Sequence, residues 1–285
     1  MPHYNLSNSQ LQKVEISGLP NAFIISNSHL ESILLNRNQI GLEFTRQCEL
    51  STKAFLEHFR SDITLSISDG IAELMLLSKG LYYWMHNAFA EVFDENLEIN
   101  FAATKRVRVS SGSVRVEVPY FNFDSPASTL ILGDTIASGT TVCEALSCYL
   151  KHWPLKRVFV FTIAGSIVGG QTISRFCESH NVELTVAYGL AAFGLGTNGF
   201  DLSFLHPDTI TSDKYRELSR ALYDGKPVSA AGWDFGTQAQ ALKKYRMLSW
   251  LEAERWGLQN NSCFAEKEPP GTSTLIDKER AAFSS

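Results

Sequence analysis

From Glu73 to Leu190 the sequence alternates short, β-rich apolar runs with helical stretches, and this alternation limits the fold more than any other feature. Strands that alternate with crossover helices of this length are typical of a parallel sheet covered on both faces. We therefore expect an α/β fold with a mostly parallel central sheet and helices on both faces. The predicted strands are ELMLL (73–77), TLILGD (129–134), RVFVFTIAG (157–165) and VELTVAYGL (182–190), and the predicted helices span about 81–92, 140–152 and 171–180.

One part of this region departs from the alternation. LEINFAATKRVRV (97–109) and VRVEVPYFNF (114–123) are two strand-like runs that follow one another with only SSGS (110–113) between them. A short linker of small residues joining two such runs indicates a hairpin or a flap.

The segments on either side of the alternating region are helical in pattern. Residues 29–60 repeat apolar positions at helical spacing. After Phe200 the strand pattern ends, and a helix is predicted between an N-cap at Ser212 and a stop at Gly225, with a longer helix after GWDFG. We expect a helical N-terminal arm (1–60), an α/β core (61–200), a helical hood or extension (201–260) and a flexible tail (261–285).

Composition excludes some functions. The chain has 285 residues, 44% of them hydrophobic, and a formal net charge of −5, which argues against a surface devoted to nucleic acid. No apolar stretch approaches the roughly 20 residues of a membrane span, and the polar start MPHYNLSNSQ does not resemble a signal peptide. None of the five cysteines forms a C-x-x-C pair, so reduced thiols are favoured over metal ligation or disulfides. We expect a cytoplasmic protein.

The stretch TLILGDTIASGTT (129–141) carries the chemistry. A buried strand ends at Asp134, and a loop of small and hydroxyl-bearing residues then leads into a helix. The free N–H groups at such a helix start favour an anion, and Gly139 lets the backbone approach it. A carboxylate at the carboxyl end of the strand can accept hydrogen bonds from sugar hydroxyls next to a phosphate. The alternative interpretation is a helix capped by small polar residues, with Asp134 as a turn residue.

This stretch resembles the 5-phosphoribosyl-1-pyrophosphate (PRPP) site of type I phosphoribosyltransferases. The rest of the chain is most similar to the uracil phosphoribosyltransferase-like family. HLESILLNRNQIGLEFTRQCELSTKAFLEHF (29–59) resembles its N-terminal helices, SKGLYYWMHNAFAEVF (78–93) its next segment, and EVPYFNF (117–123) its P-V-P-Y-F. The resemblance runs in order from about residue 29 to about residue 200.

The resemblance implies roles for particular residues and a Mg²⁺ ion bound through the diphosphate, with no side-chain metal ligand. Asp134 would hold the ribose hydroxyls, and Lys79 and Arg106 would act on the leaving pyrophosphate. The family also implies a homodimer. The residues implied to bind PRPP are Ser78, Gly80, Lys105, Arg108, Thr135, Ala137, Ser138, Gly139, Thr140 and Thr141. The alternatives are a solvated turn for Lys79 and an exposed charged strand edge for Lys105–Arg108.

Two departures from the family pattern bear on the acceptor. Gly133 stands where the family has a first acidic residue, so one carboxylate is left. The segment NGFDLSFLHPDTI (198–210) replaces the base-reading motif of uracil enzymes. Asp201 and Asp234 are candidate acceptor-binding residues, with turn roles as the alternative, and His206 is expected to be structural.

The sequence therefore supports two hypotheses. The first is an enzyme, a pentosyltransferase that binds Mg-PRPP and transfers phosphoribose to a nucleobase-like nitrogen acceptor other than uracil. The second is a non-catalytic or regulatory protein that binds PRPP or a nucleoside monophosphate, such as a sensor, a toxin-like effector or a subunit of a larger complex. The groups that would meet pyrophosphate favour the first, whereas Gly133 favours the second.

Overall fold

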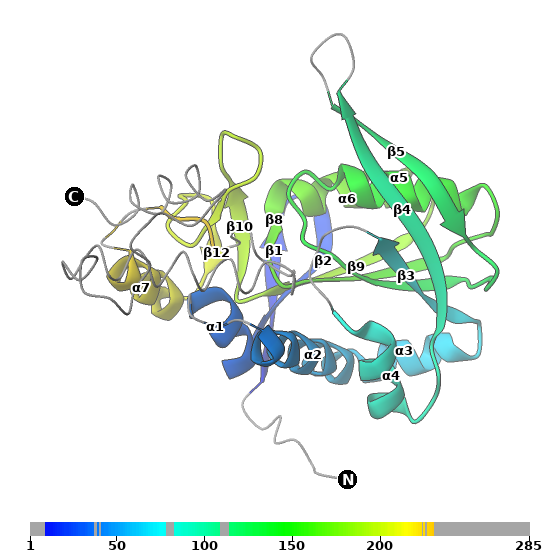
Figure 1. Cartoon of the computed structure of the whole chain (residues 1–285), viewed down its shortest axis with the longest axis horizontal. Helices are drawn as coiled ribbons and strands as arrows, with labels where there is room; N and C mark the ends of the chain where they lie inside the picture. Colours follow the sequence, from blue (N-terminus) through cyan, green and yellow to red (C-terminus); the bar gives the residue numbers. More distant parts are fainter. Residues whose placement is uncertain are drawn as a thin grey trace, which may run out of the picture.

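The computed structural model describes residues 9–36, 39, 41–77, 83–108, 114–223, 225 and 227–230. Within these ranges eight strands form a sheet in the order β1-β2-β9-β7-β6-β3-β4-β5 (Figure 1). Its strands are β1 (Gln10–Ile16), β2 (Leu19–Ser26), β3 (Ile71–Leu77), β4 (Glu98–Arg108), β5 (Val114–Asn122), β6 (Thr129–Gly133), β7 (Arg157–Thr162) and β9 (Glu183–Gly189).

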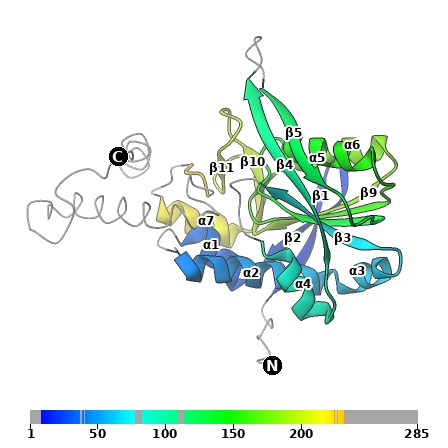
Figure 2. The ribbon, with the colours of Figure 1, turned by 45° about the vertical axis from the view of Figure 1, so that its right-hand side comes forward.

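The six strands from β2 across to β4 are parallel to one another, which confirms the mostly parallel sheet. The two edge strands, β1 and β5, are antiparallel to the strand beside them. The predicted pairing of 97–109 with 114–123 is thus confirmed as the β4–β5 ladder, which extends beyond the rest of the sheet (Figure 2). The SSGS segment itself lies outside the described residues.

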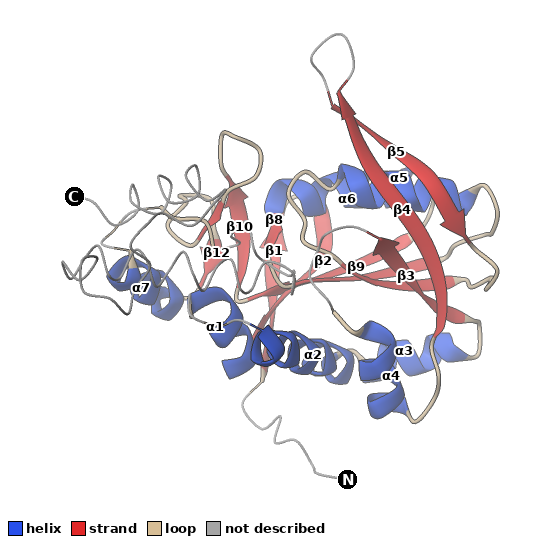
Figure 3. Cartoon of the chain, in the orientation of Figure 1, coloured by secondary structure: helices blue, strands red, loops and turns tan. Residues whose placement is uncertain are grey.

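Helices cover both faces of the sheet, as predicted (Figure 3). On one face Ile131 of β6 belongs to a buried core with α1–α4, and on the other its neighbour Leu132 packs in a core with α5 and α6. None of the described helices is long and apolar enough to cross a bilayer. The helices are α1 (Ser28–Leu35), α2 (Gly41–His58), α3 (Arg60–Ile67), α4 (Met85–Phe93), α5 (Thr140–Leu150), α6 (Ile167–Ser179) and α7 (Asp213–Leu222).

Two groups of strands were not predicted. Residues 10–26 form the β1–β2 hairpin, which pairs with β9 and so extends the central sheet. The expectation that the strand pattern ends after Phe200 is wrong, because two-residue strands lie beyond it. They belong to a small sheet of β8 (Gly165–Ser166), β10 (Ala191–Leu195), β11 (Leu202–Ser203) and β12 (Ile210–Thr211). The four-part division of the chain stays a prediction, although part of its helical arm is this hairpin.

Two helices test the predicted starts. α7 begins after Ser212, as predicted, and Gly225 beyond its end has a φ of 76°. α6 begins at Ile167, four residues before the prediction, because the Ser166 side chain caps it by accepting a hydrogen bond from the Gly169 N–H at 2.8 Å. α7 lies beside α1, where Lys214 Nζ is 2.6 Å from Glu31 Oε1.

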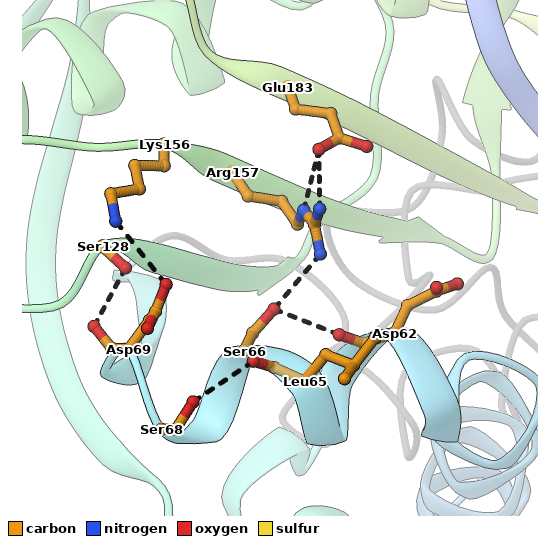
Figure 4. Close-up of polar contacts among 9 residues, drawn as sticks. All are labelled: Asp62, Leu65, Ser66, Ser68, Asp69, Ser128, Lys156, Arg157 and Glu183. Carbon is orange, nitrogen blue, oxygen red and sulfur yellow. Dashed lines mark hydrogen bonds and ion pairs between the residues drawn. The ribbon is translucent and has the colours of Figure 1, made fainter.

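A polar network joins the amino-terminal ends of the strands to α3 (Figure 4). Arg157 at the start of β7 donates twice to Glu183 Oε2, at 3.0 and 2.8 Å, and once to Ser66 Oγ at 3.4 Å. Ser128 Oγ donates to the Asp69 carbonyl at 2.9 Å, and Lys156 Nζ lies 3.5 Å from Asp69 Oδ2. These charges are paired with one another, so this edge of the sheet has a structural role.

The far end of α5 is fixed by one buried tyrosine. The Tyr149 hydroxyl accepts from the Ala127 N–H and donates to the Ala127 carbonyl, both at 2.9 Å. Ala127 lies two residues before β6, so this pair of bonds holds α5 against the strand that leads into its own N-terminus.

We expect Tyr149→Phe to lower the free energy of unfolding by about 2 kcal/mol, because it leaves both polar groups of Ala127 buried and unpaired. Urea denaturation followed by circular dichroism measures this. Tyr188→Phe is the matched control: Tyr188 is also fully buried, but its hydroxyl has no hydrogen-bond partner among the described residues. A control that costs as much as Tyr149→Phe would contradict the role of the Ala127 bonds.

Candidate functional site

The order of the strands defines where a ligand could bind. From β3 the chain moves to β4 on one side, and it then returns to β6 on the other side and continues outward to β7 and β9. The direction of winding therefore reverses between β3 and β6. In open α/β sheets ligands bind outside the carboxyl ends of the strands at such a switch point. β6 ends there at Gly133, and Asp134 follows it.

The loop after β6 is fixed by backbone contacts to the connection between β7 and α6. The Ile136 N–H donates to the Ala164 carbonyl at 3.1 Å, and its own carbonyl accepts from the Ser166 N–H at 2.8 Å. The Ser166 hydroxyl donates to the Ala137 carbonyl. The loop therefore enters α5 along a defined path.

Gly139 is required by that path. Its φ of 78° lies in the left-handed region, and a Cβ at this position would lie 2.5 Å from the Gly169 carbonyl oxygen. The amides of Thr140 and Thr141 follow it in the first turn of α5, where N–H groups have no partner inside the helix. Ser138 Oγ and Thr140 Oγ1 are 3.0 Å apart beside them. The predicted residues 137–141 thus place amides and hydroxyls at the positive end of a helix dipole, an arrangement that suits an anion.

Asp134 lies next to this arrangement, partly exposed. Its Oδ1 accepts a hydrogen bond from the Thr135 N–H at 2.8 Å. Burial raises the pKa of the Asp134 carboxyl to about 7, against that hydrogen bond and the positive charge of Arg106, which both lower it. The carboxyl therefore changes charge near neutral pH, and Arg106 is close enough to act on it.

Two of the predicted basic residues are described with their side chains. Lys105 and Arg106 are exposed on β4. The Arg106 guanidinium carbon lies 5.5 Å from the centre of the Phe200 ring, which is 61% exposed. The structure thus brings Arg106, Asp134 and Phe200 to one region. Phe200 was not predicted from the sequence as part of the site. Arg108 ends β4, with only its backbone described, and Ser78, Lys79, Gly80 and Asp234 lie outside the described residues.

Asp201 takes part in a turn. Asn198 donates to Asp201 Oδ2 at 2.6 Å, and Asn198 Oδ1 accepts from the N–H groups of Phe200 and Asp201, both at 3.0 Å. This is the turn geometry that the sequence left as the alternative, and an acceptor-binding role for Asp201 stays a prediction.

His206 has structural contacts. Its Nδ1 accepts from the Asp208 N–H at 3.2 Å, and its ring covers Gly194, where a Cβ would lie 1.9 Å from that nitrogen. Arg216 fixes the same turn by donating to the carbonyls of Phe204 and Thr209, at 3.0 and 2.7 Å.

Tyr83 is the main contact that sequence reasoning missed. A Cβ on Gly133 would lie 2.4 Å from Tyr83 Cγ, so the tyrosine ring packs directly on the glycine. The Tyr83 hydroxyl accepts from the Ile163 N–H at 3.0 Å, and its ring meets Phe161 edge-on at 5.5 Å. By the family resemblance, Gly133 stands where an acidic residue is expected. In the structure, the absence of a side chain at Gly133 also makes room for the Tyr83 ring. A glycine inside a strand can signal such a close approach.

The described residues contain no group of three or more His, Cys, Asp or Glu side chains that could hold a metal ion. Asp134 is the carboxylate at the switch point that could contact a hydrated ion carried in by a ligand.

No protein-family model matches the chain, and no curated protein matches it in sequence. Several solved structures are similar to it. The AQ2163 protein from Aquifex aeolicus is 18% identical, with a TM-score of 0.42 over 58% of this chain and 86% of that chain. Adenine phosphoribosyltransferase from Leishmania donovani is 11% identical, with a TM-score of 0.40 over 63% and 86%. The adenine enzyme from Trypanosoma brucei, solved with AMP, pyrophosphate and ribose-5-phosphate, is 12% identical, with a TM-score of 0.37 over 62% and 87%.

Proposed function

We propose that this protein binds Mg-PRPP and transfers its phosphoribosyl group to a nucleobase-like nitrogen acceptor other than uracil. One observation supports the proposal: at the switch point of a parallel sheet, Asp134 lies within reach of the charge of Arg106 and directly before residues 137–141 at the start of α5, whose amides and hydroxyls suit an anion. An anion next to a carboxylate suits a ligand that joins a phosphate to a hydroxyl-bearing sugar.

Each group has a role in this proposal. The amides and hydroxyls of 137–141 bind the 5-phosphate, and Asp134 accepts hydrogen bonds from the sugar hydroxyls. Arg106 on β4 is proposed to meet the diphosphate, and the predicted parts of Lys105 and Arg108 in binding it belong to the same proposal. Lys79, with Ser78 and Gly80, is proposed to meet the same diphosphate. The acceptor would lie toward Phe200 and Asp201, and the role of Asp234 with them is part of the proposal.

The reaction needs positioning and charge neutralisation. The bond between the anomeric carbon and the diphosphate oxygen breaks, and its electron pair leaves with the diphosphate. The lone pair of the acceptor nitrogen forms the new bond, and the proton of that nitrogen passes to solvent water. Arg106 stabilises the charge that develops on the leaving group, while the phosphate-binding residues hold the sugar in place. Mg²⁺, when bound to the diphosphate, supplies further neutralisation.

A second function is favoured by one observation. The Tyr83 ring covers Gly133, and among the described residues Asp134 is the carboxylate that follows this end of β6. A protein that binds PRPP or a nucleoside monophosphate as a sensor, effector or subunit needs residues that bind the phosphate. It does not need the full set of catalytic residues. A homodimer formed through the N-terminal helices and a cytoplasmic location belong to both proposals.

The test is pyrophosphate release from Mg-PRPP across a panel of nucleobases, together with PRPP binding by calorimetry. We expect release with at least one base other than uracil and a loss of more than 100-fold in Asp134→Asn. Binding without release from any base supports the sensor function and contradicts the transferase. Absence of PRPP and nucleotide binding contradicts both.

Two glycine variants link any binding to the predicted residues. Gly139→Ala should abolish PRPP binding, because it strains the backbone and meets the Gly169 carbonyl. Gly18→Ala is the matched control, since Gly18 has a similar φ of 73° in the β1–β2 hairpin and open space around its Cβ position. Equal binding by both variants would place the ligand elsewhere.

A further inference from the structure

Phe200 is a large apolar side chain that the fold holds out in solvent. It is 61% exposed and lies in the turn between β10 and β11. The turn is fixed by its own hydrogen bonds, because the Gly196 N–H donates to the Asp201 carbonyl and the Gly199 N–H to the Gly196 carbonyl, both at 2.8 Å. Asn198 Oδ1 also accepts from the Phe200 N–H at 3.0 Å. The backbone that carries the exposed ring is therefore held in place.

The Arg106 guanidinium is the charged group that this ring meets. Its central carbon lies 5.5 Å from the centre of the Phe200 ring, a distance at which an aromatic face attracts a cation. The contact joins the β4–β5 hairpin of the central sheet to the turn that follows β10 of the small sheet. Within the described part of the chain the guanidinium makes no hydrogen bond or ion pair, so the ring is the group that restrains it there.

The charge of Arg106 acts on Asp134. Burial raises the pKa of the Asp134 carboxyl to about 7, and the positive charge of Arg106 opposes this rise. The other described groups at the carboxyl are the Thr135 N–H, which donates to it at 2.8 Å, and the Tyr83 hydroxyl. Burial keeps the pKa of Tyr83 well above its usual value, so Tyr83 is neutral near pH 7. Among the described residues, Arg106 is therefore the charge that Asp134 experiences.

An exposed arginine has many rotamers, and the effect of its charge on a carboxyl falls with distance and with screening by solvent. A guanidinium restrained near Asp134 therefore acts on it more strongly than one that moves freely in water. We propose that Phe200 is a positioning residue of the candidate site, whose ring holds the Arg106 guanidinium where its charge reaches Asp134. This role goes beyond the proposed function, because it exists in the ligand-free protein.

The experiment measures the pKa of Asp134 in the full chain without ligand, by NMR titration of protein labelled with carboxyl-¹³C aspartate. Asp134→Asn identifies the signal of Asp134. We expect Arg106→Gln to raise the pKa by about 1 and Phe200→Leu to raise it by about 0.5. Phe200→Tyr keeps the ring and should leave the pKa as it is in the native protein. An unchanged or lower pKa in Phe200→Leu overturns the inference.

A double variant shows whether Phe200 acts through Arg106. In an Arg106→Gln background, Phe200→Leu should change the pKa of Asp134 no further, because the group that the ring positions is gone. A further rise in that background overturns the positioning role, since Phe200 would then act on the carboxyl without Arg106.

Two matched controls lie on the same hairpin. Tyr120→Leu removes another exposed ring, since Tyr120 of β5 is 56% exposed. Arg115→Gln removes a guanidinium that lies 3.6 Å from Glu117 and is opposite Val107 in the ladder, next to the position opposite Arg106. Neighbouring residues of a strand point to opposite faces, so Arg115 lies on the other face of the hairpin from Arg106. Both controls should leave the pKa of Asp134 unchanged, and a rise in either as large as in Phe200→Leu overturns the inference.

The binding of Mg-PRPP, measured by calorimetry, extends the test to the ligand, and this part rests on the proposed function. We expect Phe200→Leu to weaken binding by about threefold and Phe200→Tyr to restore it. An unchanged affinity in Phe200→Leu overturns a role for Phe200 toward the ligand. If the pKa of Asp134 responds to Phe200 as expected but the native protein does not bind PRPP, the proposed function is contradicted and the positioning role stands.

Discussion

Gly133→Ala is expected to lower the free energy of unfolding by about 3 kcal/mol, because the new methyl group would lie 2.4 Å from the ring of Tyr83. The ring cannot retreat easily: Phe161 lies beside it, and the Ile163 N–H holds its hydroxyl. The backbone at Gly133 is ordinary for a strand, so the cost arises from crowding alone. Chemical denaturation measures the loss.

A double-mutant cycle separates crowding from other causes. In a Tyr83→Ala background the methyl group has room, and Gly133→Ala should then cost less than about 1 kcal/mol. The coupling energy between the two positions is expected to be about 2 kcal/mol or more. If the cost were the same with and without Tyr83, the close packing between residues 83 and 133 could not be its source.

Asp134→Asn is expected to make the ligand-free protein more stable by about 2 kcal/mol at pH 8, even though it removes the proposed sugar contact. The folded-state pKa of Asp134 is raised to about 7 from 3.8, so the folded protein keeps a proton that the unfolded chain loses. The free energy of unfolding of the native sequence therefore falls as pH rises from about 4 to about 7. Above about pH 7 this contribution of Asp134 no longer changes with pH. One pKa unit corresponds to about 1.4 kcal/mol, and partial exposure reduces the total.

Thermal or urea unfolding between pH 4 and pH 8 tests this. The stability difference between Asp134→Asn and the native sequence should be close to zero at pH 4 and should grow up to pH 7. Asp201→Asn is a control, because that carboxylate is exposed and lies in a turn. A stability difference that is independent of pH would mean that burial does not destabilise the charged form of Asp134.

The sequence was sufficient to predict the parts of the fold in which periodicity is strong. β6, the loop after it and α5 combine a buried apolar run with a helix start of small and hydroxyl-bearing residues around Gly139, and each signal is local. The β1–β2 hairpin escaped prediction because QLQKVEI is largely polar and exposed. The strands β8, β11 and β12 have two residues each, too few to show any period.

The candidate site also contains residues that local sequence could predict and contacts that it could not. Asp134 and Gly139 could be found because strand, loop and helix lie next to one another in the sequence. Tyr83 meets Gly133 from 50 positions away, and Arg106 meets Phe200 across two separate elements, so these contacts depend on the tertiary fold. A local pattern can signal a close approach at Gly133, but it cannot name Tyr83 as the residue that makes it.

The contact between Gly139 and Gly169 has a consequence for how this protein can change. A side chain on Gly139 would meet the Gly169 backbone, and one on Gly169 would meet Ile136 and the Ala137 carbonyl oxygen, at 2.4 and 2.6 Å. Neither position can gain a methyl group while the other element stays where it is. The first turn of α6 and the loop between β6 and α5 must therefore change together, and an engineer who redesigns one must redesign the other with it.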